Sequence, residues 1–209
     1  MTKNERKNIV VFGASGKTGH QLVRYALEKG YPVTAALRDK SRLKLKYHNL
    51  NILRCDVRSK KEVDRAIKNQ DIVVSSLGSK PGQSPVCREG MENILEAMKK
   101  FRVRKLIALS AYGARETNSG FYGRSLNYLL KKIMQDKNEM EAIIEKSRMD
   151  WMVIRPVILT NGKFTDKYNL ATEGTIPGMH FISREDVARF IVDSLGKKNY
   201  KHKFITIYS

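Results

Sequence analysis

An apolar run that leads into three evenly spaced glycines is the feature that most constrains this chain. Residues Ile9 to Phe12 are apolar, and Gly13, Gly16 and Gly19 follow them. Apolar residues at helical spacing come next, and Gly30 stands past the end of that pattern. A strand, a glycine turn and a helix in this order form the context in which a dinucleotide-binding fingerprint is meaningful.

Each glycine would have its own task in such a turn. Gly13 permits the tight turn, Gly16 lets the backbone approach a pyrophosphate, and Gly19 lets the helix lie close to the strand. Backbone N–H groups and the positive end of the helix dipole would then face the phosphates. The spacing G-x-x-G-x-x-G differs from the common G-x-G-x-x-G, so a purely structural glycine turn is the alternative. The residues predicted to bind the phosphates are Gly13, Ser15, Gly16, Lys17, Thr18 and Gly19.

An arginine follows the second predicted strand. Residues Pro32 to Leu37 favour a β-strand, and Arg38 comes directly after it. A carboxylate at this place selects NAD through the ribose hydroxyls, whereas an arginine suits the 2′-phosphate of NADP. Arg42 adds a guanidinium, which can grip a phosphate with two parallel hydrogen bonds. Asp39 opposes this interpretation, and a solvated basic loop is the alternative. We predict NADP (NADPH) as the cofactor.

Strand-like and helical segments alternate along the whole chain. This pattern predicts an α/β fold, a Rossmann-like doubly wound and mostly parallel sheet with helices on both faces, in a single domain spanning residues 1–209. Strands are expected at 9–12, 32–37, 51–55, 72–77, 106–109, 151–154 and 204–208. Helices are expected at 60–68, 90–100, 126–146 and 183–195. Ser183, three residues before Asp186, has the spacing of a helix cap.

Ligands of such sheets bind at the carboxyl ends of the strands. Further cofactor-binding residues predicted at this edge are Asp56, Val57, Leu77, Gly78, Ser79, Lys80, Ser110 and Pro156. Segments 111–124 and 158–182 look like long loops that carry Gly, Asn and aromatic residues. Long loops on a rigid scaffold usually serve binding, with plain loop packing as the alternative. The predicted substrate contacts are Tyr112, Phe121, Tyr122 and Val157.

The composition is strongly basic. The 209 residues carry a formal net charge of +19 and are 41% hydrophobic. Such charge attracts nucleic acid non-specifically and steers anionic cofactors, but no nucleic-acid-binding motif is present, so we expect a solvated surface. No apolar stretch has the length of a membrane span, and the polar start lacks a signal-peptide pattern, so we expect a cytoplasmic protein. The two cysteines and four isolated histidines show no metal-ligand spacing.

These segments together resemble an atypical short-chain dehydrogenase/reductase of the NAD(P)H-binding, NmrA-like group. The motifs that carry the resemblance are Val11–Gly19, Ala36–Asp39, Cys55–Val57, Leu109–Ala111, Asp150–Pro156 and Ile182–Ala188. Within the group, the chain is most similar to the biliverdin-IXβ reductase/flavin reductase branch, through Leu77–Ser79, Glu89–Ile94 and its compact length.

The resemblance implies NADPH bound along the sheet edge, with Asp56 and Val57 near the adenine. It also implies a flavin or a linear tetrapyrrole that takes hydride from the nicotinamide. Val157 follows Pro156 at a place where the branch carries a histidine, which leaves the substrate class open.

Two sets of residues compete for the catalytic role. Ser110 ends a predicted strand and is the best-placed hydroxyl beside the nicotinamide, with a serine bonded to the backbone as the alternative. The short-chain family's Tyr-x-x-x-Lys spacing, which provides a general acid, occurs at Tyr128 and Lys132. The group's K-x-x-x-E segment resembles Lys137 to Glu141, which favours Lys137 for contact with the nicotinamide ribose. We predict Ser110 and Lys137 as catalytic residues.

The predicted function is an NADPH-dependent oxidoreductase that transfers hydride to a small planar acceptor such as a flavin, a quinone or a tetrapyrrole-like molecule. A non-catalytic NADP(H)-binding redox sensor or regulator of the NmrA-like type is the alternative, because it needs only the cofactor-binding edge. A nucleic-acid-associated protein that uses the basic surface is a third hypothesis. We expect no specific nucleic acid partner, no membrane association, no metal, and a monomer or weak homo-oligomer.

Overall fold

The expected strands and helices are present in the computed structural model, which describes residues 6–79, 82–114, 128–197 and 199–209. The strands are β1 (Ile9–Phe12), β2 (Val33–Leu37), β3 (Leu50–Arg54), β4 (Ile72–Ser75), β5 (Lys105–Leu109), β6 (Asp150–Pro156), β7 (Ile158–Thr160), β8 (Asn169–Ala171), β9 (Phe181–Ser183) and β10 (Lys203–Tyr208). The helices are α1 (Lys17–Glu28), α2 (Lys60–Ile67), α3 (Cys87–Lys100), α4 (Tyr128–Lys146) and α5 (Arg184–Asp193), and Lys40–Arg42 form a 3₁₀ turn.

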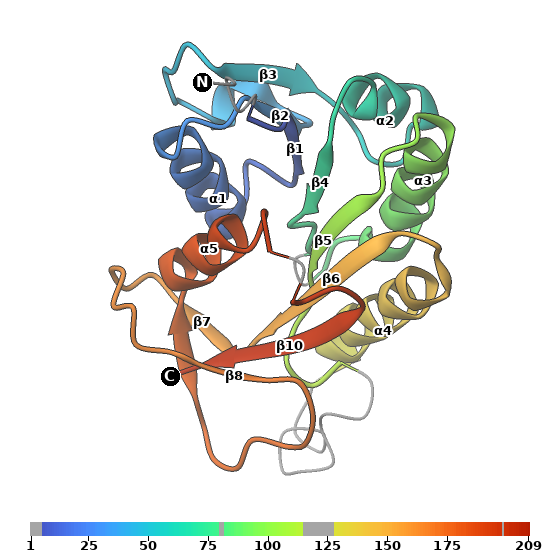
Figure 1. Cartoon of the computed structure of the whole chain (residues 1–209). Coiled ribbons are helices and arrows are strands. Elements are labelled where there is room, and N and C mark those ends of the chain that lie inside the picture. The colour runs from blue at the N-terminus through green and yellow to red at the C-terminus, as the bar shows by residue number, and fades with distance from the viewer. Residues whose placement is uncertain (1–5, 80–81, 115–127, 198) are drawn as a thin grey trace.

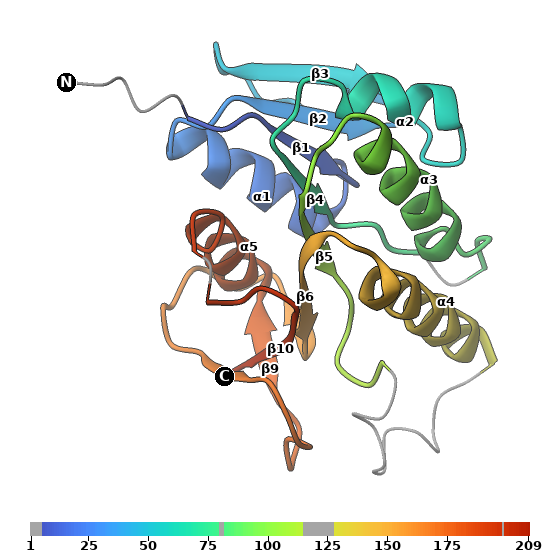
Figure 2. The same cartoon turned by 45° about the vertical axis from the view of Figure 1, so that its right-hand side comes forward.

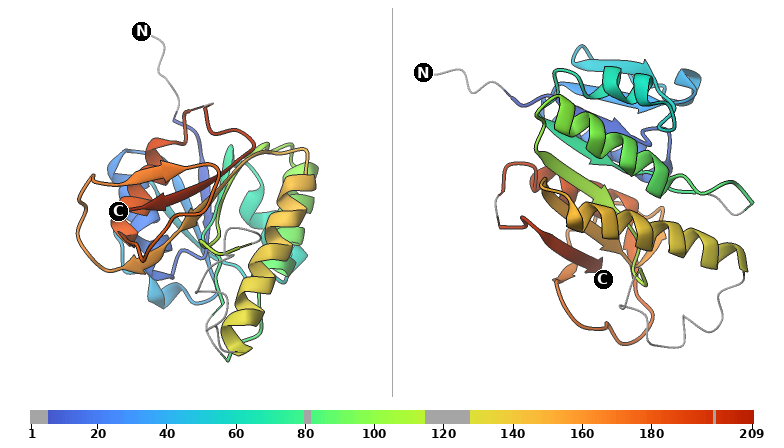
Figure 3. Two further views of the ribbon diagram at one scale, coloured as in Figure 1. Left: turned by 90° about the horizontal axis from the view of Figure 1, so that it is seen from below. Right: turned by 90° about the vertical axis from the view of Figure 1, so that its right-hand side faces the viewer.

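One large sheet organises the molecule, with the strand order β3-β2-β1-β4-β5-β6-β10-β8 (Figure 1). The strands from β3 to β10 pair in parallel, and the edge strand β8 pairs antiparallel with β10. Helices α1 and α5 cover one face, and α2, α3 and α4 cover the other (Figures 2 and 3). The predicted Rossmann-like fold is therefore confirmed. The chain order reverses between β1 and β4, and such sheets bind ligands in the crevice at that point.

The central strands are buried on both faces. In β1, Ile9 and Val11 belong to the apolar cluster under α1 and α5, whereas Val10 and Phe12 belong to the cluster under the other three helices. Alternate side chains of a strand point to opposite faces of its sheet. A continuous apolar run is therefore what a parallel strand covered by helices on both sides requires.

The segment 158–182 is not the plain loop that its composition suggests. Strands β7 and β9 pair in parallel as a separate small sheet, and β8 extends the large one. Each has only three residues, and its partner is distant in the chain, so no local alternation marks it. Asp186 is buried in the first turn of α5, and its carboxylate accepts the N–H groups of Thr165 and Asp166 at 2.9 and 3.0 Å. The predicted cap also forms, because Ser183 Oγ accepts the N–H of Asp186 at 2.9 Å.

The described part of the chain lacks membrane-spanning helices and clustered metal ligands. None of its helices combines the length and apolar character needed to cross a membrane. Its His, Cys, Asp and Glu side chains form no group of three or more that could hold a metal ion. Cys55 and Cys87 are free thiols, and both are buried.

Candidate functional site

The glycine turn after β1 is held together by close backbone contacts. Gly13 has a φ of +76°, and its carbonyl oxygen accepts the N–H of Gly16 at 2.9 Å. A Cβ at Gly19 would lie 2.2 Å from that same oxygen, and a Cβ at Gly13 would lie 2.7 Å from the carbonyl oxygen of Ser76. At Gly16 the nearest atom would be 3.2 Å away. Gly13 and Gly19 therefore serve the protein's own packing, whereas Gly16 has more room, as the approach of a ligand requires.

The start of α1 carries no anion of its own. Gly16 is the N-cap residue, no side chain caps the helix, and its first turn holds no acidic residue. The first N–H groups of a helix lack acceptors within the helix and carry partial positive charge. Because this helix end adjoins the glycine turn, the two together suit a phosphate group.

A cavity of about 380 Å³ lies beside the glycine turn. The predicted residues that line it are Gly13, Ser15, Gly16, Arg38, Arg42, Asp56, Val57, Leu77, Gly78 and Ser79. Asp39 does not line it, because its carboxylate accepts the N–H and the hydroxyl of Ser41 at 3.0 and 2.7 Å. These two hydrogen bonds lower the pKa of Asp39. The carboxylate that opposed Arg38 in the sequence is thus committed to the 3₁₀ turn.

The same cavity is lined by residues that were not predicted as site residues, namely Ala36, Leu37, Cys55, Arg58, Ser76, Gln83, Ser84 and Val86. The N–H of Arg58 donates to Asp56 Oδ1 at 3.0 Å. Its guanidinium donates to Glu89 at 2.9 Å and to the carbonyl of Pro85 at 3.0 Å, which holds it in place at the wall. Arg58 could have been found from its place two residues after Asp56. Residues 83–86 reach the cavity only through the fold, so no local signal marks them.

The two predicted catalytic residues lie near the ends of β4 and β5, and neither lines the 380 Å³ cavity. Ser110 is buried, and its N–H donates to the carbonyl of Ile154 at 2.7 Å, but its Oγ has no hydrogen-bond partner among the described residues. Lys137 is also buried, and its Nζ donates to the carbonyls of Leu77 at 2.8 Å and Leu109 at 2.7 Å. An ammonium has three N–H donors; two go to these carbonyls, and the third is within reach of the Cys87 thiol. An unpartnered buried hydroxyl costs free energy and calls for an explanation such as a bound ligand.

Buried carboxylates on α4 hold this region together. Glu141 accepts two hydrogen bonds from the guanidinium of Arg155 in β6, at 3.0 and 2.5 Å. Asp136, next to Lys137, accepts the N–H of Cys87 at the start of α3 at 2.9 Å. Helix α4 is therefore fastened to both β6 and α3, which fixes Lys137 relative to the strand ends.

Two further cavities adjoin the same edge of the sheet. One, of about 430 Å³, is lined by Ser15, Gly16, Lys17, His20, Gln21, Asn161, Gly162, Arg184 and Glu185. The other, of about 210 Å³, is lined by Ala111, Tyr112, Pro156, Val157, Ile158, Gly178 and His180. Tyr112 is held in place because its hydroxyl oxygen accepts the N–H of Ile176 at 2.9 Å. The small cavity brings together the predicted residues Tyr112, Pro156 and Val157.

The other predicted residues lie apart from these cavities. Thr18 and Gly19 are buried in α1 and line none of the three. Tyr128 is the first residue of α4, and Lys132 is exposed on that helix. Lys80, Phe121 and Tyr122, like the side chain of Tyr128, lie outside the described residues.

This chain is similar to known NAD(P)H-binding proteins. The sequence matches the NAD(P)H-binding family over residues 13–198. The uncharacterised protein YwnB of Bacillus subtilis is 26% identical over 213 residues, which cover 96% of this chain and 98% of YwnB. Two solved structures show the same fold. A short-chain dehydrogenase/reductase of Veillonella parvula in complex with NADP has 18% identity and a TM-score of 0.82, covering 97% of this chain and 94% of its own. A candidate NADH-flavin reductase of Streptococcus pneumoniae has 20% identity and a TM-score of 0.80, covering 97% and 99%. With a match over most of its length, this chain belongs to the NAD(P)H-binding family.

Proposed function

We propose that this chain is an NADPH-dependent oxidoreductase that transfers hydride to a small planar acceptor such as a flavin or a quinone. The observation that carries the proposal is the buried hydroxyl of Ser110, which lacks a partner among the described residues. Ser110 directly precedes Ala111 and Tyr112, which line the 210 Å³ cavity. Lys137 joins the carbonyl of Leu109, next to Ser110, to that of Leu77, which lines the 380 Å³ cavity. Ser110 itself lines neither cavity, and we infer that a ligand spanning both would reach its hydroxyl.

The residues present fit a dinucleotide that carries a 2′-phosphate. The glycine turn and the start of α1 would hold the pyrophosphate, and Asp56 and Val57 would lie beside the adenine. Arg38 and Arg42 would hold the 2′-phosphate, since guanidinium groups make charge-assisted pairs with phosphate oxygens. Bound NADPH would supply the hydride. The NADP held by the Veillonella protein of the same fold supports this choice of cofactor.

The chain's own groups would orient the reacting parts. Ser110 would donate a hydrogen bond to the nicotinamide end of the cofactor or to the acceptor. Lys137 would hold the ends of β4 and β5 with two N–H groups and would turn its third from the Cys87 thiol to a ribose hydroxyl. A flavin or a quinone can take its proton from water, so a tyrosine acid is not needed.

The acceptor would enter at the 210 Å³ cavity. Ile158 lines it and is 40% exposed, and Met179, between the lining residues Gly178 and His180, is 63% exposed. Phe181 follows and is 46% exposed. Exposed apolar side chains gathered beside a cavity favour a flat, apolar ligand over a small polar one.

The test is oxidation of NADPH by the purified protein with FMN, riboflavin or a quinone, compared with simple aldehydes. We expect loss of NADPH absorbance with the planar acceptors and little with the aldehydes. Tight binding of NADPH by calorimetry without oxidation by any planar acceptor would overturn the proposal. That result would favour a regulator that binds NADP(H) without turnover.

A further inference from the structure

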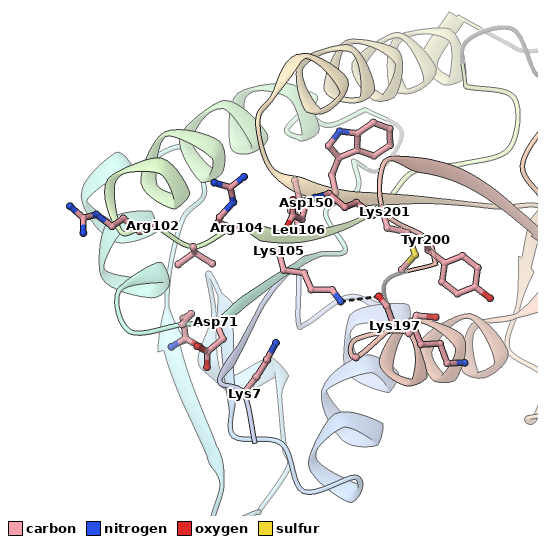
Figure 4. A pocket seen from close by; sticks show the side chains of 16 residues that line it. Lys7, Asp71, Arg102, Arg104, Lys105, Leu106, Asp150, Lys197, Tyr200 and Lys201 are labelled. Atoms are coloured by element: carbon pink, nitrogen blue, oxygen red, sulfur yellow. Dashed lines mark hydrogen bonds and ion pairs between the residues drawn. The ribbon is translucent and has the colours of Figure 1, made fainter. Parts of the chain in front are cut away.

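A cavity of about 400 Å³, shown in Figure 4, lies at the amino ends of β5 and β6, whereas the glycine turn follows the carboxyl end of β1. Lys105 and Asp150, the first residues of β5 and β6, line it, together with residues before β1 and after α5. The amino ends of parallel strands are not the edge where such sheets bind their cofactors. The cavity therefore has no part in the function proposed above.

The cavity is lined by more cations than carboxylates can neutralise. Its basic residues are Lys7, Arg102, Arg104, Lys105, Lys197 and Lys201, and its acidic residues are Asp71 and Asp150. Within the described residues, only Lys201 of this set lies within ion-pair distance of a carboxylate, with its Nζ 2.7 Å from Asp150. Asp71 is engaged by the backbone, because it accepts the N–H of Asn8 at 2.7 Å. An excess of positive charge thus surrounds one small space.

Lys105 is the most enclosed of these cations. Its Nζ donates to the carbonyl of Leu195 and, at 3.3 Å, to that of Lys197. Burial and the nearby Lys7 both lower the pKa of Lys105. In Figure 4 its side chain and that of Lys7 extend into the same space. A half-buried amine beside a second, exposed one is a favourable setting for an anion, which would offset their repulsion.

Two buried polar atoms in the lining have no partner among the described residues. Ser194 is 2% exposed, and its Oγ makes no hydrogen bond. The amide oxygen of Gln70 is also buried and makes no hydrogen bond among the described residues. Both residues line the cavity. The Ser194 hydroxyl can donate to an anion, whereas the amide oxygen of Gln70 only accepts and adds nothing to anion binding.

We propose that this cavity is a binding site for a small polyanion of the phosphate type, with pyrophosphate as its simplest form. The amines of Lys7 and Lys105 extend into a hollow that Trp151 and Leu106 also line (Figure 4). A hollow of this size suits a small molecule, whereas a nucleic acid backbone needs an open track of charge.

Trp151 provides a direct reporter, because it is the chain's single tryptophan and lines the cavity. Titration of the full chain, saturated with NADP⁺, with pyrophosphate should change the Trp151 fluorescence along a saturable curve. The same curve without NADP⁺ is expected, since the two sites lie at opposite ends of the sheet. Saturation of the cofactor site also keeps a failure here distinct from a failure of the proposed enzyme activity.

Two variants test the cavity itself. The double variant Lys7→Ala with Arg102→Ala removes two lining cations and should weaken pyrophosphate binding about tenfold or more. Gly196→Leu should abolish binding by filling the space, and it should fold, because a Cβ at Gly196 meets nothing within 4 Å. Lys61→Ala with Lys131→Ala is the control that removes the same charge from exposed helix positions and should leave the affinity unchanged.

Three results would overturn the proposal. They are a fluorescence change that never saturates, an equal loss of affinity in the control variant, and pyrophosphate binding that survives Gly196→Leu. A fourth is a short DNA duplex that displaces pyrophosphate from the wild type and still binds Gly196→Leu, which would replace the proposed site by a nucleic-acid-binding surface.

Discussion

The carboxylate of Glu141 and the guanidinium of Arg155 form a buried, two-pronged ion pair, with contacts of 3.0 and 2.5 Å. Glu141 belongs to the segment that begins with Lys137, and Arg155 directly precedes Pro156. The pair therefore joins the two segments that supply Lys137 and Pro156 to the sheet edge.

Loss of this pair should destabilise the fold. Glu141→Gln would leave Arg155 buried without a counter-charge, and breaking a buried ion pair in this way costs about 3–5 kcal/mol. Urea denaturation should show a loss of that order in the free energy of unfolding. Glu96→Gln is the control, because Glu96 pairs with Lys60 at the exposed surface. This substitution should hardly change the free energy of unfolding. Equal effects of the two substitutions would contradict the role given to the Glu141 pair.

The glycines of the turn should separate into two kinds. Gly19→Ala places a Cβ against the carbonyl of Gly13 and should lower the free energy of unfolding by about 1–3 kcal/mol. Gly16→Val should stay folded, because Gly16 has extended backbone angles that valine adopts, yet it should lose NADPH binding. Denaturation and titration calorimetry on both variants give the comparison. Normal NADPH binding by Gly16→Val would refute the phosphate-binding turn.

Arg38 should decide between the two nicotinamide cofactors. We expect the wild type to bind NADPH more tightly than NADH, and Arg38→Ala to lose about 1.5–3 kcal/mol of NADPH binding, the value of a hydrogen bond to a charged group. Its affinity for NADH should hardly change. Lys40→Ala is the charge-matched control, since Lys40 lies in the same turn without lining the cavity. Equal wild-type affinities for the two cofactors in calorimetry would rule out this role.

The unpartnered hydroxyl of Ser110 should matter for turnover and not for folding. Ser110→Ala removes a buried group without a partner, so stability should stay level or rise, while the rate of NADPH oxidation falls. Ser75→Ala is the matched control, because Ser75 Oγ on β4 is also buried and unpartnered among the described residues. Its rate should equal that of the wild type. Tyr128→Phe should also keep its rate, and a loss of about 10²–10⁴-fold there would identify Tyr128 as the acid instead.

Cys55 should be chemically inert although it lines the 380 Å³ cavity. Burial and the charges of Glu62 and Asp56 raise the pKa of its thiol to about 12. At pH 8 only about 10⁻⁴ of the thiol would be thiolate, which is the reactive form. Iodoacetamide should therefore label native Cys55 slowly and unfolded protein quickly, as peptide mass spectrometry would show. Rapid native labelling that NADPH does not slow would contradict the buried position.

The fold could be predicted because its signals are local. Continuous apolar runs such as Ile9–Phe12 mark strands buried on both faces, and the spacing from Ser183 to Asp186 marks a helix start. The three-residue strands β7, β8 and β9 could not be predicted, because their pairing depends on partners far along the chain.

The site was only partly predictable for the same reason. Arg38 follows a strand, so its place at the sheet edge could be inferred. The direction of the Asp39 carboxylate toward Ser41 depends on a turn that no periodicity shows. The two carbonyl partners of Lys137 come from two different strands, and Arg184 joins the glycine turn only through the packing of α5.

The packing of α1 against α5 also bears on how the chain acquires its structure. The two helices share one apolar cluster, and Arg24 on α1 pairs with Glu185 on α5 at 3.1 Å. Residues more than 150 positions apart thus complete one face of the sheet. During synthesis, the apolar face of α1 would stay uncovered until α5, near the end of the chain, has been made. We therefore expect a truncation before residue 184 to leave the amino-terminal part of the chain with an exposed apolar face.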